Sequence, residues 1–240
     1  MVIQPIDFPF YRSVPHTIGQ LRQFAFLLAQ TRKANQPFSS NLRSNKGLPW
    51  AKLWNEELSP LLLLGENLAF SDEDAFEIAP TGSSGPDIRL RFKQENIGIQ
   101  ITIADLEWGR EGGGGRTQFL EHEILRQGGV AWGGGGTRKD KITGSILSSP
   151  TVLSPFERVS ACRSGLWKAL ERKAGNLSAA DWLLVYARDF QIQTIDEGFE
   201  PTVAPVIESF TYLETAIGIS RIFVVTQENG SFYERKVSQK

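Results

Sequence analysis

The sequence is poor in the residues that build covalent cross-links and soft metal sites. Its 240 residues include one cysteine, Cys162, and two histidines, His16 and His122. A single cysteine excludes an intramolecular disulfide and any cysteine-based zinc site, and it suits a reducing compartment. His122 lies between two glutamates, but adjacent residues on a helix point in different directions. We therefore expect no zinc site there.

The chain also lacks long apolar runs and a strong net charge. Its longest apolar stretches, such as residues 61–64, are far shorter than the roughly 20 residues that span a bilayer. The first residues show no basic-then-apolar leader pattern. With 26 basic and 27 acidic residues the formal net charge is −1, so nucleic acid binding would need a local basic patch. We expect a cytoplasmic protein with no membrane partner.

Hydrophobic periodicity predicts an ordered series of helices and strands. Apolar residues that form a stripe at helical spacing indicate a helix, and continuous or alternating apolar runs indicate a strand. The predicted helices cover residues 16–33, 49–57 with a break, kink or new start at Pro60, 154–173 and 204–219. The predicted strands cover residues 75–79, 84–92, 97–105, 182–188 and 221–226. This order predicts an α/β fold whose mixed sheet combines an antiparallel meander with strands reached through helical crossovers.

Two runs of four glycines, at 112–115 and 133–136, interrupt this pattern. Long glycine-rich segments are costly to order. We interpret 106–150 as an insertion, with a short helix at 117–127, inside one domain that spans 1–240. That domain would comprise an N-terminal helical segment, 1–47, and a core at 48–226.

The two strands at 84–92 and 97–105 form the most informative part of the chain. Their alternation separates an apolar face from a polar one, because successive side chains of a strand point to opposite sides. The apolar set is Ile88, Leu90, Phe92, Ile97, Ile99, Ile101 and Ile103. On the other face, the hairpin can present Asp87, Gln100 and Thr102 together.

This hairpin resembles the metal-site hairpin of the PD-(D/E)XK nuclease superfamily. Pro86-Asp87 stands where that family has Pro-Asp, and Gln100-Ile101-Thr102 stands where it has Glu/Asp-X-Lys. Gln100 thus replaces the second acid and Thr102 replaces the lysine. The predicted order of elements also resembles the family core over roughly residues 50–226. The resemblance implies a restriction-endonuclease-like core with a mixed central sheet flanked by helices.

The resemblance further implies a divalent-metal nuclease acting on DNA. Asp87 and Gln100, with the carbonyl of Ile101, would hold Mg²⁺ or Mn²⁺ weakly. The family often draws another carboxylate from the preceding helix, for which Glu57 is the first candidate and Glu66 the second.

Two basic residues could replace the missing lysine. Lys173 and Arg163 lie on the apolar stripe of the helix at 154–173, so either could reach a phosphate from that helix. Weaker candidates are Arg89, Arg91 and Lys93, whose face could equally be solvated.

Two alternatives remain open. Gln100 and Thr102 would also suit a catalytically inactive nuclease-fold module that binds nucleic acid or a protein partner. The near-zero net charge would suit an interaction domain without a nucleic acid partner.

Overall fold

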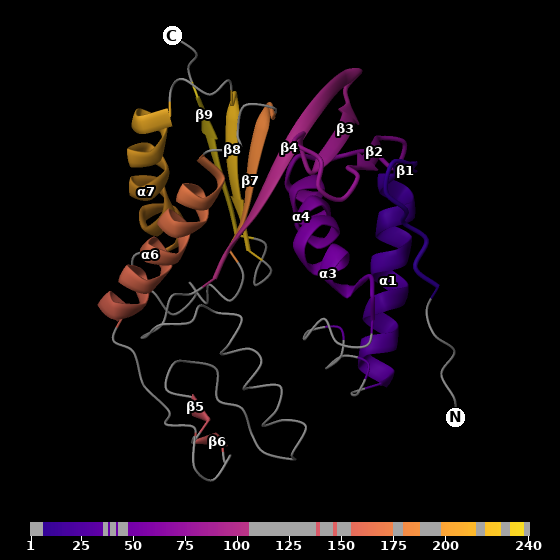
Figure 1. The fold of residues 1–240 in the computed structure, drawn as a ribbon, viewed down its shortest axis with the longest axis horizontal. Coiled ribbons are helices and arrows are strands. Elements are labelled where there is room, and N and C mark those ends of the chain that lie inside the picture. Colours follow the sequence, from indigo (N-terminus) through magenta and orange to yellow (C-terminus); the bar gives the residue numbers. More distant parts are fainter. Residues whose placement is uncertain are drawn as a thin grey trace.

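A seven-stranded mixed sheet lies between two layers of helices (Figure 1). The computed structural model describes residues 7–35, 38, 42, 48–105, 138–139, 146–147, 155–174, 180–187, 198–214, 219–226 and 231–237. The strands of the sheet are β1 (Pro15–Thr17), β2 (Ala75–Ile78), β3 (Ile88–Phe92), β4 (Glu95–Ala104), β7 (Trp182–Ala187), β8 (Arg221–Val225) and β9 (Phe232–Lys236). The helices are α1 (Ile18–Ala34), α3 (Ala51–Leu53), η1 (Trp54–Leu58), α4 (Ser59–Asn67), α6 (Pro155–Ala174) and α7 (Phe199–Glu214). The predicted α/β class is confirmed.

The strand order is β1-β2-β3-β4-β7-β8-β9. Strands β1 to β4 are antiparallel neighbours, β4, β7 and β8 run parallel, and β9 is antiparallel to β8. Parallel neighbours need a crossover connection, and α6 and α7 lie in the two connections concerned. A separate pair joins β5 (Arg138–Lys139) to β6 (Ile146–Leu147).

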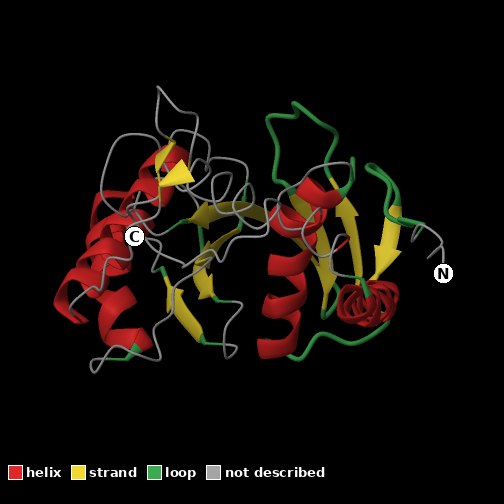
Figure 2. Cartoon of the chain, turned by 90° about the horizontal axis from the view of Figure 1, so that it is seen from below, coloured by secondary structure: helices red, strands yellow, loops and turns green. Residues whose placement is uncertain are grey.

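The sheet is buried on both faces where it is parallel. Alternate residues of β7 enter different cores: Trp182 packs with the helices before β2, and Leu183 packs with α6 and α7. Figures 1 and 2 show these two helical layers on opposite sides of the strands. This arrangement explains the continuous apolar run at 182–187, because a strand covered on both sides has no solvent-facing positions.

The first helix begins two residues later than predicted. His16 pairs with Phe76 in the sheet, so the chain is extended through Thr17 before the helix starts. Thr17 caps the helix: its hydroxyl accepts from the Gln20 backbone N–H at 3.2 Å, and the Gln20 side chain accepts from the Thr17 N–H at 2.9 Å. These two bonds form a capping box, which satisfies donors that a helix start leaves unpaired.

The helix around Pro60 restarts rather than breaks. A π-helical turn, η1, ends at Leu58, and α4 follows with Pro60 in its first turn. Proline has no backbone N–H to donate, so it is best tolerated in the first turn of a helix, where that N–H would have no partner within the helix. One of the outcomes expected at this proline is thus confirmed, and the wider turn before it carries Glu57.

The helix predicted at 204–219 was placed wrongly. It begins at Phe199, and Ile219 lies outside it. Pro201 fits the first turn of the observed helix, whereas Pro205 lies inside it and cannot donate to the carbonyl of Pro201. A side chain from α6 compensates for that loss, as described below.

Strands β1 and β9 were not predicted. The glycine runs and the helix predicted at 117–127 lie outside the described residues. Among the described helices, none combines the length and the apolar character needed to cross a membrane.

Candidate functional site

Asp87 lies at the entrance of β3, opposite the middle of β4. Ile88 pairs with Ile99, which brings Asp87 beside Gln100. A backbone hydrogen bond from Ala79 N to Asp87 O at 2.9 Å closes the base of the loop between β2 and β3. The predicted juxtaposition of Asp87 and Gln100 therefore follows directly from the hairpin register.

The Asp87 carboxylate is held through one of its two oxygens. Its Oδ2 accepts from Gln100 Nε2 at 2.7 Å and from the backbone N–H of Ile101 at 2.7 Å. The ammonium of Lys173 lies 3.4 Å from the same oxygen. Among the described residues, no donor lies within hydrogen-bonding distance of Oδ1. One carboxylate oxygen is thus fixed, and the other remains able to bind a ligand.

Lys173 reaches this position from the last turn of α6. That helix crosses over between β4 and β7, so its C-terminal part passes above the middle of β4. The side chains of Lys173 and Asp87 are 23% and 31% exposed, so solvent screens the pair only in part. Of the two basic residues considered as substitutes for the missing lysine, Lys173 is the one that lies beside Asp87.

Glu57 approaches the same place from η1. Its side chain is 19% exposed and accepts from Arg12 Nη2 at 2.8 Å and from Arg12 Nη1 at 3.4 Å. Burial raises the pKa of the Glu57 carboxyl, the hydrogen bond and charge of Arg12 oppose the rise, and the charge of Asp87 adds to it. The two carboxylates are therefore close enough to interact electrostatically.

Arg12 is a site residue that the sequence did not indicate. Its Nη1 also donates to Ala79 O at 2.7 Å, so one side chain joins η1 to the loop that precedes Asp87. The next residue, Ser13, has a φ of 61°, and its N–H donates to Ile78 O at 2.8 Å, which holds this segment against β2. No local pattern marks this contact, because Arg12 and Glu57 are 45 residues apart.

Three other candidates lie away from Asp87. Thr102 is buried under α6, where its hydroxyl donates to Ala169 O at 3.3 Å. Glu66 is exposed on α4. Arg163 donates from Nε to Thr202 O at 3.3 Å and from Nη2 to Pro201 O at 3.0 Å, which are backbone groups of α7. The apolar stripe of α6 thus faces α7 at Arg163, and the C-terminal part of α6 faces β4.

Gln100 is also more buried than a polar hairpin face would suggest, with 5% of its surface exposed. Helix α6 covers the polar face of the hairpin along β4. The same face is open along β3, where Arg89 and Arg91 are exposed. The open part of the polar face is therefore the part beside Asp87.

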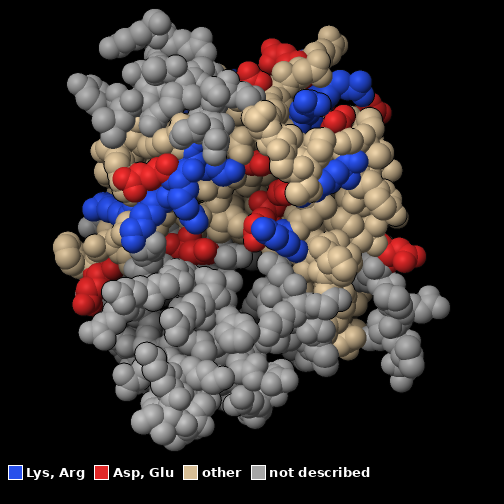
Figure 3. Space-filling view, in the orientation of Figure 1, with Lys and Arg blue, Asp and Glu red and all other residues tan. Residues whose placement is uncertain are grey.

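Basic side chains gather next to the site. Lys168, Arg172 and Lys173 follow one another on α6, and Arg172 donates to Ile103 O at 2.7 Å. Figure 3 shows lysine and arginine side chains over the region of α6 and acidic side chains in the middle of the same face. Basic side chains thus cluster over α6, with acidic side chains beside them, although the whole chain is nearly neutral.

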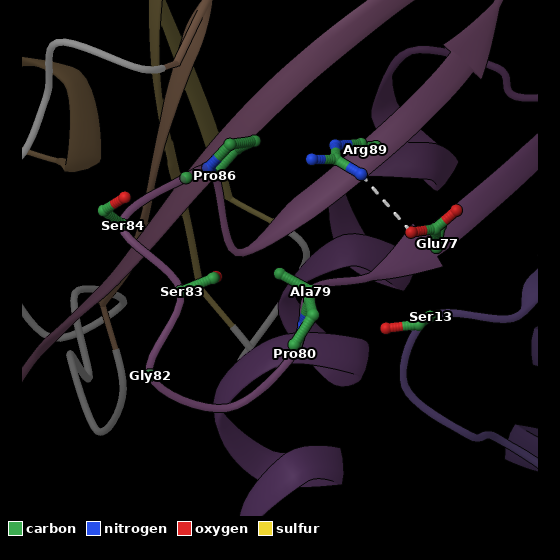
Figure 4. A pocket seen from close by; sticks show the side chains of 10 residues that line it. Ser13, Glu77, Ala79, Pro80, Gly82, Ser83, Ser84, Pro86 and Arg89 are labelled. Carbon is green, nitrogen blue, oxygen red and sulfur yellow. Dashed lines mark hydrogen bonds and ion pairs between the residues drawn. The ribbon is translucent and has the colours of Figure 1, made fainter.

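A pocket of about 600 Å³ lies beside Asp87, over the exposed face of β2 and β3. Figure 4 shows the loop from Pro80 to Ser84 along one side and Arg89 with Glu77 on the strands. Its lining residues are Ser13, Glu77, Ala79, Pro80, Gly82, Ser83, Ser84, Gly85, Pro86 and Arg89.

The acidic groups are too few for a metal site made of protein carboxylates alone. Among the residues that the structure describes, no group of three or more His, Cys, Asp and Glu side chains could hold a metal ion. Comparisons with protein-family models, with curated proteins and with solved structures found no match to this chain.

Proposed function

We propose that this protein is a divalent-metal nuclease of the PD-(D/E)XK type that hydrolyses DNA phosphodiester bonds. The observation that carries the proposal is the position of Lys173, whose Nζ lies 3.4 Å from Asp87 Oδ2 while Gln100 contacts the same oxygen. A carboxylate, an amide and an ammonium thus converge, although the hairpin itself lacks the lysine. The proposal includes a cytoplasmic location, to which the single buried Cys162 is suited.

The donor atoms around Asp87 fit a hard cation such as Mg²⁺ or Mn²⁺. Asp87 Oδ1, the Glu57 carboxylate and the carbonyl oxygens of Gln100 and Ile101 are all hard oxygen ligands. In the structure the amide nitrogen of Gln100 faces Asp87, so Gln100 would hold the ion only with its amide turned over. A bound ion would polarise the phosphate and acidify a water molecule. With two carboxylates, we expect weak affinity that substrate phosphate completes.

The side chains around this site have separate tasks in the proposal. Lys173 would attract the scissile phosphate and stabilise the negative charge that grows on it. Burial raises the pKa of the Glu57 carboxyl, and Arg12 favours its ionised form, because the hydrogen bond and the charge of Arg12 both oppose that rise. Ile101 N–H fixes Asp87 Oδ2 at 2.7 Å, so that the carboxylate keeps one orientation.

The decisive experiment is cleavage of duplex DNA, single-stranded DNA and RNA by the wild type and by Asp87→Ala. Each substrate is incubated with Mn²⁺ and with EDTA. Asp87→Asn is a second variant that retains an oxygen to accept from Ile101 N–H, in case the alanine variant is unstable. Glu66→Ala, at an exposed position of α4, is the matched acidic control.

We expect Mn²⁺-dependent cutting by the wild type and Glu66→Ala, and none by either Asp87 variant. Equal cutting by folded Asp87→Ala would refute the assignment. RNA as the only substrate cut would correct the substrate while leaving the site in place.

One observation favours a second candidate, a nuclease-fold module that binds nucleic acid without cutting it. Each carboxylate already has a basic partner, Asp87 with Lys173 and Glu57 with Arg12. Charges balanced in this way need no metal. This candidate predicts metal-independent, salt-sensitive binding without turnover.

A further inference from the structure

We propose that the pocket beside Asp87 binds one unpaired nucleotide of a single-stranded DNA segment, next to the phosphate that Asp87 and Lys173 face. This inference deepens the proposed function and rests on it for the position of that phosphate. It assigns a substrate class, because a nucleotide can enter the pocket only where its base is not held in a duplex.

The dimensions of the pocket suit a single nucleotide. Its volume of about 600 Å³ falls within the range of about 300–1,000 Å³ that is typical of small-molecule sites. A base pair would bring a second base, sugar and phosphate, whereas a single nucleotide has the size of a small-molecule ligand. The pocket therefore favours one base with its sugar.

The position of the pocket links it to the phosphate site. Arg89 lines the pocket and lies two residues after Asp87, on the same face of the chain. Two residues of a strand span about 6.6 Å, a distance that one nucleotide can bridge. A base in the pocket would thus belong to a nucleotide adjacent to the phosphate at Asp87.

The rim of the pocket is made of small residues. Gly85 is one of them, and a Cβ added there would meet no other atom within 4 Å. Gly82 has a φ of 79°, so glycine suits the turn of the loop at this point. The hydroxyls of Ser13, Ser83 and Ser84 can bond to sugar or base without adding charge. Because the residues of the loop at 80–85 are small, their side chains leave the pocket next to Asp87 open.

The floor offers one donor group and one acceptor group. Arg89 Nη1 and Glu77 Oε1 are 3.4 Å apart, and the two side chains are 67% and 31% exposed. So long and exposed an ion pair contributes little to stability, and it can open at small cost. Guanidinium and carboxylate groups then present hydrogen bonds to the polar edge of a base, and the guanidinium plane can stack on its face.

The test is binding of fluorescein-labelled single-stranded and blunt duplex DNA of equal length, followed by anisotropy in EDTA so that nothing is cut. Gly85→Leu adds a side chain at one residue that lines the pocket, and Ser84→Trp is a second variant that adds a larger one at another lining residue. Asn96→Leu, exposed at the opposite end of the hairpin, is the control for added apolar surface. Thermal unfolding establishes that each variant is folded.

We expect the wild type to bind the single strand at least about tenfold more tightly than the duplex, and the pocket variants to lose about tenfold in that affinity. Asn96→Leu keeps it. Equal binding of both DNA forms by the wild type, or unchanged affinity in a folded pocket variant, overturns the inference.

Cleavage in Mn²⁺ separates this inference from the proposed function. Single-strand binding that depends on the pocket, without cleavage, would support the pocket and refute the nuclease. Cleavage by the wild type with an unchanged KM in Gly85→Leu would support the nuclease and refute the pocket.

Discussion

Lys173 and Asp87 are 86 residues apart in the sequence and form an ion pair of 3.4 Å in the fold. The lysine comes from the crossover helix α6 and the aspartate from the start of β3. The register of β3 with β4 places Gln100 against the same carboxylate. A long-range crossover and a local hairpin thus assemble the site together.

Replacement of Lys173 by methionine should remove the charge and keep most of the packing. We expect cleavage to fall by about 10²–10³-fold, as when one group that stabilises a transition state is lost. The salt dependence of DNA binding should also weaken by about one unit of slope, because one phosphate contact disappears. Single-turnover cleavage and binding at several salt concentrations would measure both effects.

Lys168→Met is the control for that experiment, because Lys168 is exposed on the same helix. We expect it to cleave at nearly the wild-type rate. Similar losses in the two variants would indicate a general effect of basic charge and would remove the specific role assigned to Lys173.

Arg12→Met should raise the pKa of Glu57 further, because Arg12 supplies the hydrogen bond and the charge that lower it. A carboxyl whose folded pKa exceeds its unfolded value binds more protons in the folded state. Its contribution to the free energy of unfolding is therefore full below the ordinary value of 4.5 and is lost as pH rises through the folded pKa. In Arg12→Met this loss should extend to higher pH.

Urea unfolding between pH 4 and pH 8 would measure that shift. The double variant Arg12→Met/Glu57→Gln isolates it, because every other titrating group is the same in both proteins. We expect the single variant to lose stability with rising pH relative to the double variant. Parallel curves would mean that burial does not raise this pKa.

Arg163 and Pro205 should prove coupled in stability. Proline at 205 cannot donate to Pro201 O, and the Arg163 guanidinium donates to that carbonyl at 3.0 Å. Arg163→Ala should therefore cost about 1–2 kcal/mol in the free energy of unfolding. In a Pro205→Ala background the new backbone N–H can donate to Pro201 O. Arg163→Ala should therefore reduce the free energy of unfolding by less in that background.

A double-mutant cycle in urea would measure this coupling, which we expect to be about 0.5–1 kcal/mol. Ser164→Ala, at the exposed next position of α6, controls for changes in helix propensity. Additive costs would show that Arg163 does not compensate for the proline. Single-strand affinity should stay unchanged in Arg163→Ala, because this residue faces α7.

The sequence was informative where a pattern is local and strong. The alternation at 97–104, the apolar run at 182–187 and the stripe of α6 each predicted an element within a few residues of its observed bounds. The juxtaposition of Asp87 with Gln100 needed only a hairpin register. Lys173 was proposed because the stripe of α6 pointed inward.

The missed features depend on tertiary contacts. Strand β1 has three residues and exists because β2 pairs with it, so no periodicity could have indicated it. Arg12 meets Glu57 across 45 residues. The start of α7 was also missed. Pro205 lies inside this helix, and Arg163 from another helix donates to the carbonyl of Pro201, to which the proline cannot donate.

Gln100→Glu should restore the second acidic residue of the motif. We expect the stability of this variant to depend on a bound metal ion. The change removes the amide that donates to Asp87 Oδ2 at 2.7 Å and places a second carboxylate there, at a position that is 5% exposed. Without a cation, we expect a loss of about 2–3 kcal/mol in the free energy of unfolding, from the lost hydrogen bond and the like charges. At lower pH part of this loss of stability should disappear, because the two carboxylates can share one proton.

Millimolar Mn²⁺ should restore the stability of Gln100→Glu, because an ion between the two carboxylates offsets their repulsion. Thermal unfolding with EDTA and with Mn²⁺ measures this, with the wild type and Asp87→Asn/Gln100→Glu alongside. We expect the Mn²⁺-induced rise in Tm to be largest in Gln100→Glu, small in the wild type and smaller in the double variant than in Gln100→Glu. An equal rise in Tm in all three proteins would mean that the ion binds elsewhere and that the hairpin holds no metal site.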